Sequence, residues 1–166
     1  MRWALALLSI PSLAGCHLVF PIESADETSP PSCPLEFGGA RYIAIARRQP
    51  WGVAKTACEQ LEGTNMYSHL AIVNDPSEAS LMSSFITADA WVGLTDLPDM
   101  TFRWITTEPT IGMPWIAGQP DDPMRAEGNC GRVLLDGTGL ADGSCASDER
   151  PAVCECDEYP IDGSRF

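Results

Sequence analysis

The sequence predicts one α+β domain with two helices, several short strands and one long irregular segment. Three observations support this fold class. Apolar residues recur at helical spacing after Pro50 and after Pro76. Several runs of four to six residues are apolar or alternate between apolar and polar residues, which is typical of strands. Residues 106–129 contain four prolines and three glycines, so they are expected to form a loop.

The domain is expected to open with a strand and a helix. Residues 41–46 alternate as a strand does. The helix is predicted to begin at Pro50-Trp51, because proline is tolerated in a first turn. It is predicted to end at Gly63, since glycine often caps the C-terminal end of a helix. Its buried stripe would consist of Ala54, Ala57, Cys58 and Leu61.

A second helix is predicted after a short apolar strand at residues 69–73. Asp75 is a suitable N-cap, Pro76 suits the first turn, and Glu78 lies three residues after the cap. Two short strands, at residues 90–94 and 101–105, are expected next, with a Pro-Asp turn between them. The inward face of the helix would consist of Ala79, Met82, Phe85 and Ile86.

The last part of the domain is predicted as a long loop followed by two strands. A loop as long as residues 106–129 is usually functional or disordered. The two closing strands are expected at residues 132–135 and 152–155. The stretch between them is interpreted as a polar loop region because of its acids, which are Asp136, Asp142, Asp148 and Glu149.

The first fifteen residues are predicted to be a lipoprotein signal peptide. Arg2 supplies one positive charge, and the apolar run at residues 3–14 is too short to cross a bilayer, which needs about 20 apolar residues. The run ends in Leu-Ala-Gly-Cys, which resembles the bacterial lipobox and implies that Cys16 is lipidated. The alternative is an ordinary cleaved signal with a chance cysteine. Because His17 follows the cysteine instead of aspartate, we expect an outer-membrane lipoprotein, on the periplasmic face or the cell surface.

The cysteine count agrees with lipidation. The chain has seven cysteines, and an odd number in an exported protein leaves one thiol to explain. Lipidation of Cys16 would leave six, which can all pair. The predicted organisation is therefore the signal peptide at 1–15, the lipidated cysteine and a flexible acidic, Pro-rich tether at 16–32, a folded domain at 33–156 and a C-terminal tail at 157–166.

The net charge excludes one class of partner. The chain carries 10 Lys and Arg against 23 Asp and Glu, for a formal charge of −13. Such a surface repels phosphate backbones, and the sequence has no basic stripe, so nucleic-acid binding is not expected. Anionic head groups are repelled as well, so membrane association would need the lipid anchor. The acidity also has a simpler interpretation, which is that it keeps the surface soluble.

Residues 33–156 contain, in this order, the helix from Trp51 to Cys58, WVGL at 91–94, FRW at 102–104, WIAGQPDD at 115–122, Cys130, Cys145 and AVCE at 152–155. These pieces resemble the C-type lectin domain family and come in that family's order. The resemblance implies the C-type lectin-like fold and the disulfides Cys58–Cys154 and Cys130–Cys145. Cys33 and Cys156 are then left for each other, although the long form of the family ties its N-terminal cysteine to the first strand, where this chain has no cysteine.

Gln119-Pro120-Asp121 resembles the sugar-binding tripeptide of this family, in its galactose-type order. A cis proline would turn the oxygens of both flanking side chains towards one point, where they could coordinate calcium and hydrogen-bond sugar hydroxyls. The resemblance implies that Gln119, Asp121 and Asp142 bind the ligand. It implies that the same three residues and Glu127 hold the calcium ion.

The remainder of this site departs from the family pattern. Gly128 stands where the family has a glutamate, and Glu127 comes one residue early. The family's Trp-Asn-Asp is Leu-Ala-Asp at residues 140–142, and residues 122–129 hold no aromatic residue to stack on galactose. Calcium takes about six to eight oxygens, and the four candidate side chains would offer about five. The alternative is that residues 118–122 form a polar turn in a retained scaffold.

The sequence therefore predicts a lipid-anchored extracytoplasmic lectin-like binding protein. One hypothesis is calcium-dependent binding of a galactose-type carbohydrate. The others are a calcium-independent module for a protein or surface ligand, and a structural envelope lipoprotein. Trp104 and Trp115 are expected in the core. No enzyme is predicted, because His17 lies in the tether, His69 is at a packing or turn position, and residues 137–139 lack the context of a phosphate loop.

Overall fold

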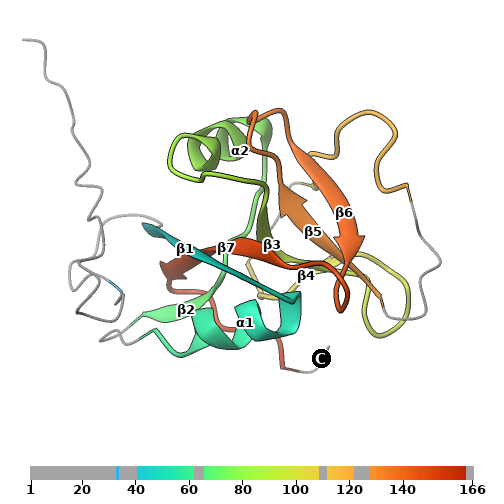
Figure 1. The fold of residues 1–166 in the computed structure, drawn as a ribbon. Coiled ribbons are helices and arrows are strands. Elements are labelled where there is room, and N and C mark those ends of the chain that lie inside the picture. The colour runs from blue at the N-terminus through green and yellow to red at the C-terminus, as the bar shows by residue number, and fades with distance from the viewer. Residues whose placement is uncertain (1–32, 34–40, 62–65, 109–111, 122–127, 164–166) are drawn as a thin grey trace, which may run out of the picture.

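The computed structural model describes residues 33, 41–61, 66–108, 112–121 and 128–163. The predicted signal peptide, Cys16 and the tether lie outside these residues, and so does Glu127. In the described ranges, a seven-stranded sheet has the order β1-β7-β3-β5-β6, while β2 pairs with β7 and β4 with β3 (Figure 1). The elements are β1 (Arg41–Gln49), α1 (Trp51–Glu59), β2 (Tyr67–Leu70), α2 (Pro76–Ser83), β3 (Ala90–Thr95), β4 (Arg103–Trp104), β5 (Asn129–Val133), β6 (Leu140–Ser144) and β7 (Arg150–Asp157).

The strand β7 organises the domain. It pairs antiparallel with both β1 and β2, and it meets β3 in parallel. Successive side chains of a strand point to opposite faces. Cys154 and Cys156 therefore lie on one face of β7, while Glu155 and Asp157 lie on the other. The alternation separates two disulfides from two buried acids.

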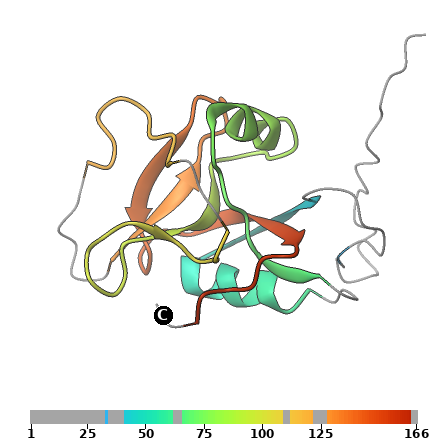
Figure 2. The same ribbon diagram turned by 180° about the vertical axis from the view of Figure 1, so that it is seen from behind.

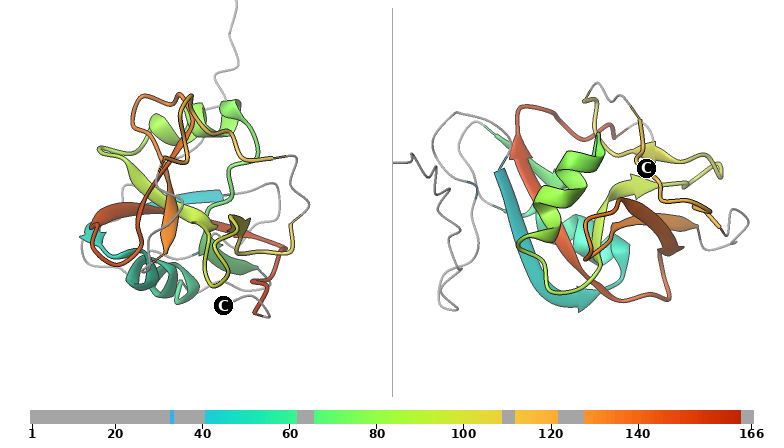
Figure 3. Two further views of the ribbon diagram at one scale, coloured as in Figure 1. Left: turned by 90° about the vertical axis from the view of Figure 1, so that its right-hand side faces the viewer. Right: turned by 90° about the horizontal axis from the view of Figure 1, so that it is seen from above.

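The two helices cover opposite faces of the sheet (Figures 1 and 3). α1 begins after Pro50 as predicted, but it ends at Glu59 with Gln60 as its C-cap, so the prediction that Gly63 caps it is wrong. The physical reason is a side chain from the next strand. The Ser68 hydroxyl donates hydrogen bonds to the carbonyls of Cys58 and Leu61, which satisfies the end of the helix without a glycine.

The predicted start of α2 is confirmed. The Asp75 carboxylate accepts hydrogen bonds from the backbone N–H groups of Ser77 and Glu78, and Pro76 occupies the first helical position. The helix ends at Ser83, so the predicted inward-facing pair at residues 85 and 86 follows the helix. No helix in the described ranges is long and apolar enough to cross a membrane.

Several strand predictions need correction. β2 begins two residues earlier than expected and ends at Leu70, because residues 71–73 are buried without continuing the ladder. β4 contains only Arg103 and Trp104. β5 begins at Asn129, three residues before the predicted start, and ends at Val133. β6 replaces part of the predicted polar loop. Its sequence, LADGS, has low strand propensity, and pairing with β5 in the register Val133↔Leu140 makes it a strand.

Three disulfides and a continuous apolar core hold these elements together. The pairs are Cys33–Cys156, Cys58–Cys154 and Cys130–Cys145, which confirms the expected pairing. Trp104 is buried as predicted, whereas Trp115 is only partly buried and packs edge-on against Phe102, with 4.9 Å between ring centroids. The disulfides thus connect α1, β5 and the N-terminal part of the domain to the rest of the sheet.

Candidate functional site

The tripeptide segment lies alongside β6. Leu140 of that strand bridges to Trp115, its N–H donates to the Pro114 carbonyl at 2.9 Å, and its carbonyl accepts from Ile116 at 3.0 Å. Gly139, in the turn from β5 to β6, permits this approach, since a Cβ there would lie 2.4 Å from the Pro114 oxygen. Residues 137–139 therefore belong to the turn against which residues 114–121, the site segment, pack.

This packing brings Gln119, Asp121 and Asp142 together. The peptide bond between Gln119 and Pro120 is cis. The Oε1 atom of Gln119 accepts a hydrogen bond from the Asp142 N–H at 3.0 Å, and Oδ1 of Asp142 accepts one from the Asp121 N–H at 3.1 Å. Three of the four residues singled out in the sequence thus share one site, and Glu127 lies outside the described residues.

Asp142 carries the most informative atom of the site. Its side chain is 5% exposed, and its Oδ2 is buried without a hydrogen-bond partner among the described residues. Leaving a buried carboxylate oxygen unsatisfied is costly, and an ion or an ordered water is the usual explanation. Because Asp121 is exposed beside it, this donor set fits a hard cation such as calcium, which binds carboxylate and amide oxygens.

The two departures from the family pattern have structural causes. Gly128 adopts a φ of +80°, and a Cβ there would lie 2.5 Å from the Leu97 side chain, so glutamate does not fit at this position. Ala141, which stands where the family has asparagine, has no side-chain oxygen, so this position of β6 supplies none next to Asp142. The described part of the site therefore offers fewer oxygens than calcium requires.

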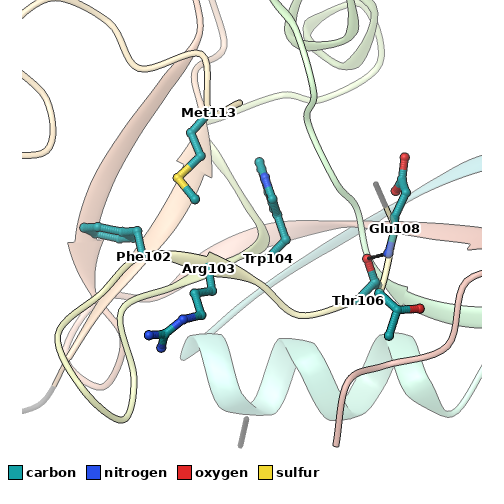
Figure 4. Close-up of a pocket in the computed structure, with 7 residues that line it drawn as sticks. Phe102, Arg103, Trp104, Thr106, Glu108 and Met113 are labelled. Carbon is teal, nitrogen blue, oxygen red and sulfur yellow. Dashed lines mark hydrogen bonds between the residues drawn. The ribbon is translucent and has the colours of Figure 1, made fainter. Parts of the chain in front are cut away.

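A cavity of about 290 Å³ lies elsewhere, beside β4 (Figure 4). Arg103 at its edge is held by Asp99 through two hydrogen bonds of 2.6 and 2.7 Å. Figure 4 shows the Arg103 and Glu108 side chains pointing away from each other. Among the described lining residues, this acid and this basic side chain are therefore not neighbours. Its lining residues are Phe102, Arg103, Trp104, Thr106, Thr107, Glu108 and Met113.

A buried acidic cluster was missed by the sequence analysis. Carboxylate oxygens of Glu108, Glu155 and Asp157 all lie within 4.8 Å of one another. His69, predicted only as a packing position, is fully buried and contacts Asp157 at 3.1 Å. The one signal in the sequence is the pattern Cys-Glu-Cys-Asp at the end of the last strand, where two acids alternate with two apolar-facing cysteines.

Burial and proximity shift the pKa values in this cluster. Burial raises the pKa of Glu155 to about 7, and burial also raises the pKa of Glu108. For His69, burial lowers the pKa, but hydrogen bonds to Asp157 and to the Leu70 carbonyl, together with the nearby carboxylates, raise it overall. The cluster therefore favours the protonated form of each of these three groups.

The comparisons with known proteins agree with the fold. The Lectin C-type domain family matches residues 47–156. The C-type lectin CEL-I from Cucumaria echinata is 23% identical with a TM-score of 0.62, over 75% of this chain and 96% of that one. The cow CD23 carbohydrate-recognition domain, solved in the presence of a GlcNAc2Man3 oligosaccharide, is 26% identical with a TM-score of 0.60, over 75% and 95%.

A third solved structure shows that the fold also occurs without calcium dependence. A calcium-independent type II antifreeze protein is 17% identical with a TM-score of 0.59, over 74% of this chain and 92% of that one. At this identity the likeness concerns the fold alone. With the family match, these structures confirm the C-type lectin-like fold expected from the sequence. The chain belongs to the C-type lectin domain family.

Proposed function

We propose that this protein binds a galactose-type carbohydrate through a calcium ion held at Gln119, Asp121 and Asp142. The observation that carries the proposal is the buried Oδ2 of Asp142 next to the tripeptide, which has no hydrogen-bond partner among the described residues. A calcium ion at this point would satisfy that oxygen and would supply open coordination positions for two neighbouring sugar hydroxyls. The cow CD23 domain, solved with an oligosaccharide, supports carbohydrate as the ligand class.

Asp142, Gln119 and Asp121 have different roles in binding. The Asp142 carboxylate is held in place by the Asp121 N–H, so its free oxygen has a fixed position. Gln119 is held by the Asp142 N–H, so its amide donor is directed away from that bond and is available to a sugar hydroxyl. Asp121 supplies an exposed acceptor. Glu127, sugar hydroxyls and water would complete the coordination sphere.

Calorimetry with calcium tests this proposal. The oxidised protein should release or absorb heat on titration with millimolar calcium, and Asp142→Asn should lower the affinity at least tenfold. Glu149→Gln is the matched control, because Glu149 is an exposed acid outside the site. Absence of any heat from the wild-type protein would contradict calcium binding.

A calcium-independent binding module is the second candidate. It is favoured by the missing oxygens at Gly128 and Ala141 and by the fold shared with a calcium-independent antifreeze protein. In that case the ligand is a protein or another surface molecule, or the domain serves as a structural envelope component. A glycan array with and without EDTA distinguishes the candidates, because only the first loses its signal on chelation.

The proposal includes the location of the protein. We infer that Cys16 is lipidated and that the domain is carried outside the cytoplasm on the outer membrane by residues 17–32, with no catalytic activity of its own. The number of cysteines supports lipidation of Cys16, since the six other cysteines are paired with each other. Cys16→Ser should move the protein from the membrane fraction to the soluble fraction. Mass spectrometry of a mature wild-type N-terminus without acyl chains would contradict lipidation.

A further inference from the structure

We propose that His69, Glu108, Glu155 and Asp157 form a proton-linked latch, in which retained protons hold residues 105–108 and the C-terminal segment onto β7. The latch lies apart from the tripeptide site and does not depend on the proposed function. Its four residues come from three places in the chain. His69 belongs to β2, Glu108 precedes the site segment, and the other two acids belong to β7.

In the proposed latch both ring nitrogens of His69 carry a proton, and each faces an oxygen atom. Nδ1 lies 2.9 Å from the carbonyl oxygen of Leu70, and Nε2 lies 3.1 Å from Oδ1 of Asp157. The Leu70 carbonyl oxygen accepts only, so Nδ1 donates to it, and in the proposed latch Nε2 donates to the Asp157 carboxylate. The ring is fully buried, so water cannot replace either partner. His69 is therefore a buried imidazolium that serves as the counter-ion of Asp157.

One imidazolium does not balance the acids around it. Glu155 is 3% exposed, and its carboxylate accepts a hydrogen bond from the Ile72 N–H at 2.9 Å. Carboxylates this close cannot all be ionised, so at least one retains a proton. The titratable groups that face the cluster are Tyr42 from β1, His69 from β2, Glu78 from α2, Glu108, and the two acids of β7, and His69 is the one cation among the described side chains in this set.

The cluster is connected to two segments, residues 105–108 and residues 158–162, which are also hydrogen-bonded to each other. Glu108 accepts from the Asn74 side chain at 2.8 Å, and Asp157 accepts from the Tyr159 N–H at 2.7 Å. After β7 the chain turns back (Figure 2), and its Asp162 N–H donates to the Ile105 carbonyl at 2.8 Å. Full ionisation of the acids would drive Glu108 away from β7. The segment containing residues 105–108 and the segment containing residues 158–162 would then loosen together.

The direction of the pH dependence follows from the retained protons. The raised pKa of Glu155, at about 7, means that the folded state binds a proton that the unfolded chain releases near its ordinary pKa. This contribution to stability is fully present below the unfolded pKa and is lost as the pH rises through about 7. The raised pKa values of His69 and Glu108 act in the same direction. The latch is closed in mild acid and weakens in mild alkali.

Denaturation and hydrogen exchange on the full oxidised chain test the latch. In EDTA, which keeps cations off the carboxylates, the denaturation midpoint should fall between pH 5 and pH 8. Amides in residues 105–107 and 159–162 should lose at least tenfold of their protection, after correction for intrinsic exchange. Glu155→Gln, which imitates the protonated acid, should flatten both trends, while the exposed control Glu149→Gln should keep them.

A second measurement leaves every residue of the cluster unchanged. The chain has two histidines, so His17→Gln leaves His69 as the sole imidazole for NMR titration. We expect its ring to titrate with a pKa above the ordinary value of about 6.5. A denaturation midpoint that is constant or rises between pH 5 and pH 8, or a His69 ring that is neutral at pH 6, would overturn the proposal.

Discussion

The Oε1 atom of Gln119 accepts a hydrogen bond from the backbone N–H of Asp142, at 3.0 Å. The two residues are 23 positions apart, and the bond fixes the tripeptide onto β6 before any ligand is present. The return bond from the Asp121 N–H to Asp142 closes the arrangement. The hydrogen bonds within the chain therefore hold the binding residues in place, which lowers the entropy lost when a ligand binds.

Substitution of Gln119 should separate the structural role of its oxygen from the role of its amide. Gln119→Ala leaves the Asp142 N–H without an acceptor, which should cost about 1 kcal/mol in the free energy of unfolding and abolish sugar binding. Gln119→Glu keeps an acceptor and loses a donor, so the stability should be retained while galactose binding falls at least tenfold. Denaturation curves and calorimetry on both variants provide the comparison. Equal effects of the two variants on stability would contradict the role of the Oε1 atom.

Restoring the family's glutamate at position 128 should harm this protein. Gly128 has a φ of +80° and faces the Leu97 side chain, so Gly128→Glu should lower the free energy of unfolding by about 1–3 kcal/mol. It should not raise the calcium affinity. Gly112→Ala is the control, since a Cβ there has no neighbour within 4 Å. Tighter calcium binding by Gly128→Glu would show that the site is only one side chain short.

Gly139 should influence the site without touching a ligand. A Cβ at this position would meet the Pro114 carbonyl, so Gly139→Ala should push the site segment off β6. Calcium affinity should then fall at least tenfold, while the far sheet around β7 keeps its protection against hydrogen exchange. Unchanged affinity would mean that the bond from Leu140 to Pro114 does not position the tripeptide.

The disulfides should contribute different amounts to the free energy of unfolding, according to the lengths of the loops that they close. The Cys58–Cys154 bond spans 96 residues and the Cys130–Cys145 bond spans 15. On the chain-entropy account, removal of the longer loop with paired alanines should cost about 1.5 kcal/mol more. Guanidinium denaturation of the two double variants measures the difference. The opposite order would indicate that packing around the shorter bond outweighs chain entropy.

Asp75 should contribute acid sensitivity to α2. Hydrogen bonds from Ser77 and Glu78 hold the pKa of Asp75 below its usual range. A lowered pKa gives stability that is present above the unfolded value and is lost as the pH falls through the folded value. Asp75→Ala should therefore lower the thermal midpoint at pH 7 and change it little at pH 2, whereas Asp75→Asn keeps the cap. An equal loss at both pH values would exclude the carboxylate as the cause.

Local signals in the sequence predicted the elements that depend on local physics. The start of α2 follows from Asp75 and Pro76. The predicted buried stripe of α1 is confirmed at Ala54 and Cys58, whereas Ala57 is half-buried and Leu61 follows the end of the helix. The disulfide pairing followed from the resemblance to the lectin family and from the one pair left over.

The elements that depend on distant partners were harder to predict. β6 was missed because Leu-Ala-Asp-Gly-Ser becomes a strand only against β5. The same error placed Asp142 in a loop, although its residue type and its role as a candidate ligand were correctly singled out. The cluster around His69 joins positions 69, 108, 155 and 157, so no window of sequence contains it.

Retention on immobilised galactose tests the central claim most directly. The oxidised protein is applied to the resin in millimolar calcium, with Asp142→Asn and Glu149→Gln run beside it. We predict that the wild type and Glu149→Gln are retained and then eluted by EDTA, while Asp142→Asn flows through. Passage of the folded wild-type protein straight through the resin, or retention that EDTA does not reverse, would contradict calcium-dependent galactose binding at Gln119, Asp121 and Asp142.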